Sequence, residues 1–362
     1  MINQIRKLIP LVLLCLTIVA NAQPGLQSNA VKKDWWHIDV LHPYKLPQGI
    51  KKMSYIKVKG NTFVDESGKI IVFKGLSISD PDKLVKDGHW NKKHFEVIKS
   101  WGANVIRIPV HPVAFHQRGV VEYVKLLDEA VNWCSELGIY VIIDWHAIGN
   151  LPMEIFSQDM HNTSKKETFN FWRLIAEHYK DVPTVAFYEL FNEPTTYEGQ
   201  YGTASWEEWK QLMEKLIDLV FVYNKNVIPL VAGFNWAYDL TPVRENPIAR
   251  EGIAYVTHPY PGKRAVPREP KWELDFGFVA DKYPVVATEL GFMKGDEDVN
   301  LKDDGVYGKS IVNYFNKKGI SWVVWVFDPE WIPQMIENWN YEPTGQGKFF
   351  RDVFQGKFKY DK

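Results

Sequence analysis

Two glutamates stand at the ends of apolar, strand-like runs in this chain of 362 residues. The first run, residues 185–191, leads into Asn192, Glu193 and Pro194, and the second, residues 285–288, leads into Glu289. A short apolar run of this kind is typical of a buried strand, and a carboxylate at its end emerges where the strand leaves its sheet. Two such carboxylates that face each other could perform general acid–base and nucleophilic chemistry.

The rest of the chain repeats one pattern, an apolar strand followed by an amphipathic helix. Predicted strands cover residues 71–76, 104–109, 140–144, 185–191, 228–232, 253–257, 285–288 and 320–326. Predicted helices cover residues 93–101, 121–137, 165–179, 205–223 and 306–318, and Gly102, Gly138 and Gly319 have the positions of helix C-caps. Continuous apolar strands between helices indicate a parallel sheet covered on both sides. Eight such units in one domain predict an α/β fold, a (β/α)8 TIM barrel, and no glycine-rich dinucleotide motif follows the first strand.

In such a barrel the carboxyl ends of the strands meet at one face, where the loops form the active site. Strands four and seven lie on opposite sides of the ring, so Glu193 and Glu289 can face each other there. Two carboxylates above an aromatic floor suit glycoside hydrolysis, in which one protonates the leaving oxygen and the other attacks the anomeric carbon. We expect Arg107 and Tyr260 to keep Glu289 ionised, and its charge to raise the pKa of Glu193.

The motifs at these strand ends resemble those of glycoside hydrolase family 5, the cellulase family. The resemblance extends from the predicted hairpin at Gly60-Asn61 to the predicted strand that contains Trp325. It rests on these motifs: Phe191-Asn192-Glu193-Pro194, Arg107, His146, His258-x-Tyr260, Thr288-Glu289-x-Gly291 and Trp325. It implies that Glu193 is the acid/base and Glu289 the nucleophile of a double displacement. It also implies that Asn192 binds the sugar 2-hydroxyl, that Trp325 is the platform under the sugar, and that Arg107, His146, His258 and Tyr260 frame the carboxylates.

The resemblance implies a retaining endo-β-glycosidase that needs no cofactor and no metal and has a polysaccharide as its partner. Cellulose-type β-1,4-glucan is the commonest substrate of the family, and mannan, xyloglucan and mixed-linkage glucan stay open, as does cleavage at chain ends. A glycan-binding barrel without catalysis is a further alternative. A metal-dependent hydrolase is disfavoured because the first strand carries no histidine ligand.

Several polar side chains near these motifs have a structural interpretation. Glu189 lies deeper in its strand than Glu193, so we expect it to be buried and paired with Arg107, and Asp144 is expected to orient a histidine. In the eighth loop, Asp328 and Glu330 either bind sugar hydroxyls or cap a turn. His111 and His116 are expected to be ordinary loop residues.

Tryptophan is abundant, with 15 residues in the chain, and its ring either fills a core or stacks on a sugar. Those on helical faces are predicted to be core residues: Trp101, Trp133 and Trp172. Those near predicted loop mouths are candidate sugar-binding residues: Trp236, Trp331, Trp145 and Trp90. Trp35 and Trp36, near the N-terminus, could instead cover the barrel floor.

Residues 1–22 have the pattern of a signal peptide, with Arg6 and Lys7 before an apolar segment and Ala20-Asn21-Ala22 at its end. We therefore expect a secreted protein, extracellular or periplasmic, that has no membrane segment after cleavage. Residues 23–51 are predicted to form an extended arm, and residues 52–362 the catalytic domain, which begins with a β-hairpin. The balance of 43 basic and 44 acidic residues argues against a nucleic-acid partner, and we expect a monomer.

Overall fold

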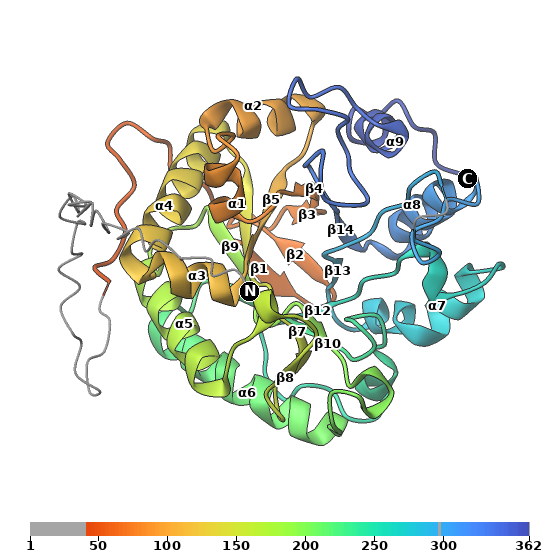
Figure 1. Ribbon diagram of the computed structural model, residues 1–362, viewed down its shortest axis with the longest axis horizontal. Helices are drawn as coiled ribbons and strands as arrows, with labels where there is room; N and C mark the ends of the chain where they lie inside the picture. The colour runs from red at the N-terminus through yellow and green to blue at the C-terminus, as the bar shows by residue number, and fades with distance from the viewer. Residues whose placement is uncertain (1–40, 296–297, 362) are drawn as a thin grey trace, which may run out of the picture. The chain divides into compact units, whose positions relative to one another are not determined.

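Eight parallel strands close into a barrel whose order around the ring follows the order of the chain. The computed structural model describes residues 41–295 and 298–361, so the predicted signal peptide, Trp35 and Trp36 lie outside the described residues. The barrel strands are β4 (Lys74–Ser77), β5 (Val105–Val110), β6 (Tyr140–Trp145), β9 (Val185–Glu189), β11 (Ile228–Ala232), β12 (Ala254–Val256), β13 (Val285–Ala287) and β14 (Ser321–Val324). Helices surround them (Figure 1), which confirms the predicted (β/α)8 barrel.

The helices that cover the barrel include all five predicted ones, each displaced by no more than one residue at either end. The α-helices are α1 (Pro81–Lys86), α2 (Lys92–Trp101), α3 (Pro112–Arg118), α4 (Val120–Leu137), α5 (Lys165–His178), α6 (Trp206–Tyr223), α7 (Glu269–Asp275), α8 (Tyr307–Lys318) and α9 (Gly345–Phe354). The 3-10 helices are Asp159–His161, Tyr197–Gly199, Thr241–Arg244, Pro261–Lys263 and Gly277–Asp281. In the segment between β11 and β12, a 3-10 helix stands where the repeating pattern predicts an α-helix. None of the described helices is long and apolar enough to cross a bilayer.

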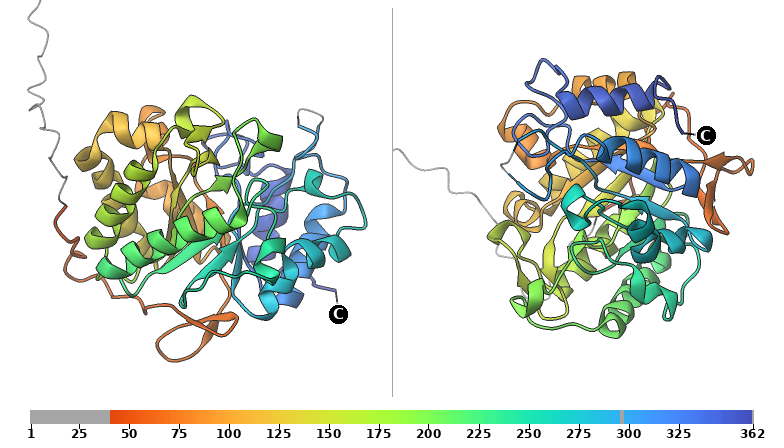
Figure 2. Two further views of the ribbon diagram at one scale, coloured as in Figure 1. Left: turned by 90° about the horizontal axis from the view of Figure 1, so that it is seen from below. Right: turned by 90° about the vertical axis from the view of Figure 1, so that its right-hand side faces the viewer.

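Two small sheets flank the barrel. At the N-terminal end, β1 (Lys57–Lys59), β2 (Thr62–Val64) and β3 (Ile70–Ile71) form the predicted hairpin and one further strand. The predicted strand 71–76 is therefore wrong as one element, because Ile71 pairs with β2 and the barrel strand begins at Lys74. The ring of Phe63 lies edge-on to Phe73 and Phe187, 5.6 and 5.2 Å away, so the hairpin closes this end of the barrel (Figure 2). The second small sheet lies at the opposite end of the barrel, beside the candidate site.

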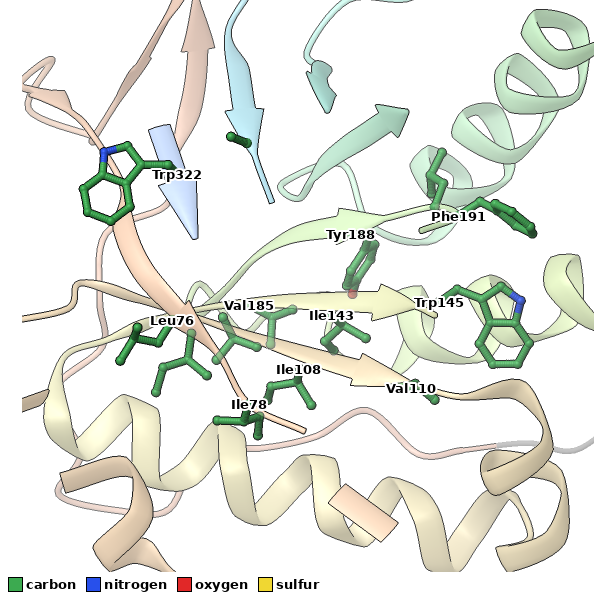
Figure 3. Close-up of a cluster of buried hydrophobic side chains, with 14 of the residues drawn as sticks. Leu76, Ile78, Ile108, Val110, Ile143, Trp145, Val185, Tyr188, Phe191 and Trp322 are labelled. Atoms are coloured by element: carbon green, nitrogen blue, oxygen red, sulfur yellow. The ribbon is translucent and has the colours of Figure 1, made fainter. Parts of the chain in front are cut away.

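Successive residues of the barrel strands point alternately into the barrel and out toward the helices. Val105, Ile142 and Phe187 belong to one apolar cluster, which fills the interior together with other strand residues. The residues that directly follow them belong to a second cluster that includes helical residues, and Figure 3 shows part of it, with Ile143 and Tyr188. The side chains of both layers are buried, so each strand is covered on its two faces, as its continuous apolar sequence predicts.

The same alternation places polar side chains above the apolar floor of the barrel. Arg107, Asp144 and Glu189 each follow an inward-pointing residue by two positions, on β5, β6 and β9. They therefore point into the barrel one layer nearer its carboxyl end, and none of them has measurable exposure. This buried polar layer is the base on which the candidate site stands.

Candidate active site

Arg107 lies at the centre of the polar layer and connects four neighbouring side chains. Its Nε and Nη2 donate to the two carboxylate oxygens of Glu189 at 2.7 and 3.2 Å, which confirms the predicted pairing. Nη1 donates to Glu289 at 2.9 Å, and Nη2 also lies 2.6 Å from Asn192 Oδ1 and 2.9 Å from Asp144 Oδ2. A guanidinium is planar and its donors are fixed, so this one group aligns the ends of several strands.

Glu193 is held by backbone pairing just beyond the end of β9. With Pro194 it forms β10 (Glu193–Pro194), which pairs with β7 (Ile148–Asn150), and β7 also pairs with β8 (Ile155–Phe156). The Glu193 N–H donates to the Ala147 carbonyl at 3.1 Å. The second small sheet thus fixes the peptide that carries the carboxylate, while the side chain keeps 11% exposure.

Glu289 follows β13 and lies opposite Glu193. One carboxylate oxygen of each residue lies within 4.8 Å of the other. Arg107 donates to Oε1 of Glu289, and the Tyr260 hydroxyl donates to Oε2 at 2.8 Å. The structure therefore brings the two predicted glutamates together, with the two predicted partners of Glu289 in place.

His258 lies between the two glutamates and is completely buried. Its Nδ1 is 3.0 Å from Glu193 and 3.8 Å from Glu289, and its Nε2 is 2.9 Å from the Thr288 hydroxyl. That hydroxyl donates to Glu189 at 2.8 Å, so it must accept from His258 and Nε2 carries a proton. The contact between Nδ1 and Glu193 requires one further proton, and that proton is bound either to His258 or to Glu193.

The protonation of the two glutamates differs from the sequence-based expectation. Burial opposes the charged imidazolium, but Glu289 and the bonds to Glu189 and Glu193 outweigh it and raise the pKa of His258 to about 9. Burial also raises the pKa of Glu193, but the bond and the charge of His258 lower it below its ordinary value. Burial, aided by the charge of Glu193, raises the pKa of Glu289 despite His258 and Arg107. The expected order of the two pKa values is therefore wrong, because the imidazolium binds Glu193 directly.

Asn192 and His146 also reach the site, as predicted. Asn192 Oδ1 accepts from Arg107, whereas its buried Nδ2 has no hydrogen-bond partner in the described chain. Nδ1 of His146 lies 2.6 Å from Asp144, which confirms that Asp144 orients a histidine. Burial, with the charges of nearby His111 and Arg107, lowers the pKa of His146 well below its usual range, so its ring is neutral. Both side chains are thus oriented and have hydrogen-bonding capacity for a ligand.

Two further histidines lie beside His146, and the sequence reasoning did not assign them to the site. The ring of His111 lies 4.6 Å from that of His146 and 5.4 Å from that of His161. Asp80 holds Nδ1 of His111 at 3.1 Å, and the backbone of His146 holds Nδ1 of His161 at 3.0 Å. His111 directly follows β5 and lies two residues after the predicted second strand, which is a signal that could have identified it. His161 comes from the middle of a long loop, and its sequence context gives no such signal.

Trp325 is largely buried, with 9% exposure, and its ring lies parallel to that of His146 at 5.2 Å. The ring of Trp331 follows at 5.8 Å, inclined by 19°. On another part of the rim, the half-buried ring of Trp236 lies 5.5 Å from Tyr197 and 4.7 Å from the ammonium group of Lys263. Aromatic rings therefore lie at two places around the carboxylates.

Two of the candidate sugar-binding tryptophans are wrong. Trp145 has no exposure, stacks on Phe171 at 4.2 Å and donates to Thr168, so its ring faces α5 and not the site. Trp90 packs between α2 and α4 against Trp133, and its Nε1 donates to Glu129 at 2.7 Å. Both belong to the packing of the helical layer. The three predicted core tryptophans also lie in or against the apolar core: Trp101, Trp133 and Trp172.

The two acids of the eighth loop have different surroundings. Asp328 has no exposure and accepts from Ser79 at 2.6 Å, from Lys83 at 2.9 Å and from the backbone N–H groups of Glu330 and Trp331. It therefore caps the turn that presents Trp331, which favours the structural alternative for this residue. The Glu330 side chain keeps 59% exposure and pairs with Lys83.

One group of side chains in the described chain has the geometry to hold a metal ion, namely Glu193, His258 and Glu289. Their potential ligand atoms lie within 4.8 Å of one another. These are the same residues that form the acid pair, and Nδ1 of His258 would have to lose its proton to act as a ligand. Proton chemistry and metal binding would therefore compete for the same atoms.

With this geometry in hand, comparison with known proteins identifies the family. The model of the cellulase family, glycosyl hydrolase family 5, matches residues 64–330. The chain belongs to glycosyl hydrolase family 5. It is accordingly a β-glycoside hydrolase, and its barrel is that of the family 5 structures.

Three relatives show how far the similarity extends. A crystallised β-glucanase from Saccharophagus degradans is 48% identical, with a TM-score of 0.86, over 90% of this chain and 100% of that chain. The same enzyme has been solved in complex with cellotetraose. An endoglucanase of Paenibacillus polymyxa is 24% identical over 76% of this chain and 80% of its own length. Endoglucanase A of Butyrivibrio fibrisolvens is 28% identical over 70% of this chain, which spans only 56% of that relative.

Proposed function

We propose that this family 5 protein is a retaining endo-β-1,4-glucanase that cleaves by double displacement, with Glu289 as the nucleophile and Glu193 as the acid/base. The observation that carries the proposal is the short separation of the carboxylates, whose nearest oxygens lie within 4.8 Å. Retaining glycosidases hold their two carboxyl groups about 5 to 5.5 Å apart, whereas inverting enzymes leave about 6.5 to 9.5 Å for a water molecule. The separation thus supports direct attack on the sugar by a carboxylate.

Glu289 has the surroundings of a nucleophile. Arg107 and Tyr260 each donate to one of its oxygens, and both bonds favour the ionised form. Because burial and Glu193 act in the opposite direction, its negative charge is only partly stabilised by the protein. In the first step a Glu289 oxygen bonds to the anomeric carbon while the bond to the leaving oxygen breaks, and water later hydrolyses the glycosyl–enzyme ester.

Glu193 and His258 together supply the proton for the leaving group. One proton lies between them, and attack by Glu289 removes the negative charge that helps to keep His258 protonated. That proton then moves to Glu193 and on to the leaving oxygen, and in the second step Glu193 accepts it back from water. The free Nδ2 of Asn192 is the donor for the 2-hydroxyl of the sugar, and Trp325 is the platform beneath it.

The substrate proposal rests on the relatives and on the aromatic rim. The β-glucanase at 48% identity and its cellotetraose complex favour a β-1,4-linked glucan, either cellulose or mixed-linkage glucan. Trp331 and Trp236 would contact sugars at a distance from the cleavage point. Xyloglucan, mannan and a binding protein without turnover are the alternatives. The N-terminal sequence pattern supports secretion, and a monomer is part of the proposal.

The test is release of reducing sugar from carboxymethyl-cellulose, mixed-linkage β-glucan, xyloglucan, glucomannan and xylan by the purified protein, with Glu289→Ala as the control. We expect glucan cleavage by the wild type alone, with a rapid fall in viscosity that marks internal cleavage. Proton NMR of the first product should show the β-anomer. An α-anomer as first product would refute the retaining mechanism, and binding without turnover would favour the non-catalytic alternative.

A further inference from the structure

The chain segments that carry Glu289 and Trp325 continue side by side after their strands end. In the barrel, Val286 of β13 is opposite Ser321 of β14. Beyond the strand ends, the Trp325 N–H still donates to the Leu290 carbonyl at 2.9 Å. In a parallel ladder, a residue that donates in this way accepts, through its carbonyl, from the partner residue two positions further on. The next bond would therefore run from the Phe292 N–H to the Trp325 carbonyl.

The side chain of Gln346 occupies the place of that bond. Its Oε1 accepts from the Phe292 N–H, and its Nε2 donates to the carbonyls of Trp325 at 3.1 Å and Pro333 at 2.8 Å. A carboxamide has the donor and the acceptor of a peptide group. It can therefore continue a hydrogen-bond ladder between two backbone segments that do not bond to each other directly. Both N–H groups of the amide are used, and the residue has only 4% exposure.

We propose that Gln346 is a positioning residue, whose amide sets the separation between the segment that carries Glu289 and the segment that carries Trp325. This inference rests on the proposed roles of those two residues. Arg107 and Tyr260 bind the Glu289 carboxylate itself. Trp325 and Gln346 instead bind the backbone that follows Glu289, at Leu290 and Phe292. Removal of the amide would allow the nucleophile and the platform to move relative to each other.

Gly291 supports the same interpretation. A Cβ atom at this position would lie 2.7 Å from Pro333, 2.8 Å from Oε1 of Gln346 and 2.9 Å from the Trp325 carbonyl oxygen. All three contacts are shorter than carbon makes without displacement of its neighbours, so the inserted amide requires glycine here. Gly291 and Gln346 thus belong to one arrangement, although 54 residues separate Gln346 from its bonding partner Phe292.

Gln346 lies in the first turn of α9. Thr344 is the N-cap of this helix, and its hydroxyl accepts from the Gly347 N–H at 3.0 Å and donates to the Gln334 carbonyl at 2.8 Å. Thr344 makes no hydrogen bond to Phe292, Trp325 or Pro333. Thr344→Ala therefore weakens the same helix without removal of the amide, and it is a matched control for a loss of stability.

The experiment measures attack by Glu289 directly, in the full chain. A dinitrophenyl β-cellobioside with fluorine in place of the 2-hydroxyl forms a bond from Glu289 to its anomeric carbon and expels dinitrophenolate, and the labelled peptide is identified by mass spectrometry. Gln346→Met keeps the size of the side chain and removes its three hydrogen bonds. Displacement of a nucleophile by about 1 Å can cost about 100-fold in rate. We expect Gln346→Met to slow labelling by about 10- to 100-fold and to lower kcat far more than it changes KM.

Label on a wild-type residue other than Glu289 would refute the proposed function, and with it the basis of this inference. Label on Glu289 at equal rates in Gln346→Met and Thr344→Ala, at similar melting temperatures, would leave the function intact and refute the positioning role. If Gln346→Met does not fold, Gly291→Ala tests the same contact from the other side. Slow labelling of Gly291→Ala relative to Thr344→Ala supports the proposal, and an unchanged rate overturns it.

Discussion

The interior of the barrel and its loop rim contribute to the site in different ways. Arg107 and Glu189 come from strands whose side chains alternate with a fixed period of two, so a strand in register must point them inward. Trp331 depends on the turn capped by Asp328, and Trp236 lies in a run where Asn235, Trp236 and Ala237 have positive φ angles of 59°, 54° and 58°. The interior is thus determined by sheet geometry, whereas the rim is determined by individual loop contacts.

The largest expected effect concerns the interior. Glu289→Ala should reduce turnover by about 10⁴-fold or more, because loss of a nucleophile removes the covalent route altogether. Added azide or formate should restore part of the activity, since a small anion fits the space left by the carboxylate, and the product should then have inverted configuration. Rates with an aryl β-cellobioside and NMR of the product test this. A variant that no anion rescues would contradict the nucleophile assignment.

A second test compares two glutamates of the interior that stand four residues apart. Glu193→Gln should lose about 10² to 10⁴-fold with unactivated substrates, where general acid help matters, and far less in the glycosylation step with dinitrophenyl glycosides. Glu189→Gln weakens the pair with Arg107 and should lower both stability and activity, whatever the leaving group. The measurement is the dependence of the glycosylation rate on the pKa of the leaving group. Equal dependence in both variants would mean that the acid has been assigned to the wrong residue.

These two regions also differ in how well the sequence predicts them. The barrel, its eight strands and the convergence of Arg107, Glu193 and Glu289 follow from apolar runs that end in polar residues. Local patterns are sufficient because strand period and barrel closure convert sequence position into spatial position. The predicted strand 71–76 is an exception, because only two residues separate β3 from β4 and the apolar pattern continues across the gap.

Loop residues lack such a rule. His161 reaches the site because its ring bonds to the backbone of His146, and this contact between distant residues leaves no mark on the local sequence. Trp145 is the last residue of β6 and Trp325 directly follows β14. The Trp145 ring nevertheless points outward, because the alternation of β6 places it on the helical face, next to the inward-pointing Asp144. The sequence around Gln346 carries no signal of its role, since that role depends on three backbone groups from other segments. Predictions at the rim therefore need the tertiary structure.

A third, smaller effect separates a rim tryptophan from one in the helical layer. Trp331→Ala should raise KM for a polymeric glucan by about 2- to 10-fold, because an aromatic contact contributes about 0.5 to 1.5 kcal/mol. Trp90→Ala should leave this KM unchanged and lower the free energy of unfolding by about 1 to 3 kcal/mol, since the half-buried ring packs against Trp133. Polymer kinetics and chemical denaturation measure the two quantities. If Trp90→Ala raised KM as much as Trp331→Ala, the assignment of Trp331 to the substrate-binding rim and of Trp90 to the helical layer would be incorrect.

The smallest expected change is in the pH dependence. The pKa of His258 is raised to about 9, above its unfolded value of about 6.5. Its contribution to the free energy of unfolding is therefore complete below about pH 6.5 and is lost as the pH rises through 9. The alkaline limb of kcat/KM should follow, because the proton shared with Glu193 is lost there. The acid limb should lie above the ordinary range of a glutamate, since the pKa of Glu289 is raised.

Tyr260→Phe removes a bond that lowers this pKa, so it should move the acid limb to higher pH and leave the alkaline limb in place. A shift of both limbs would show that Tyr260 acts on the whole network and not on Glu289 alone.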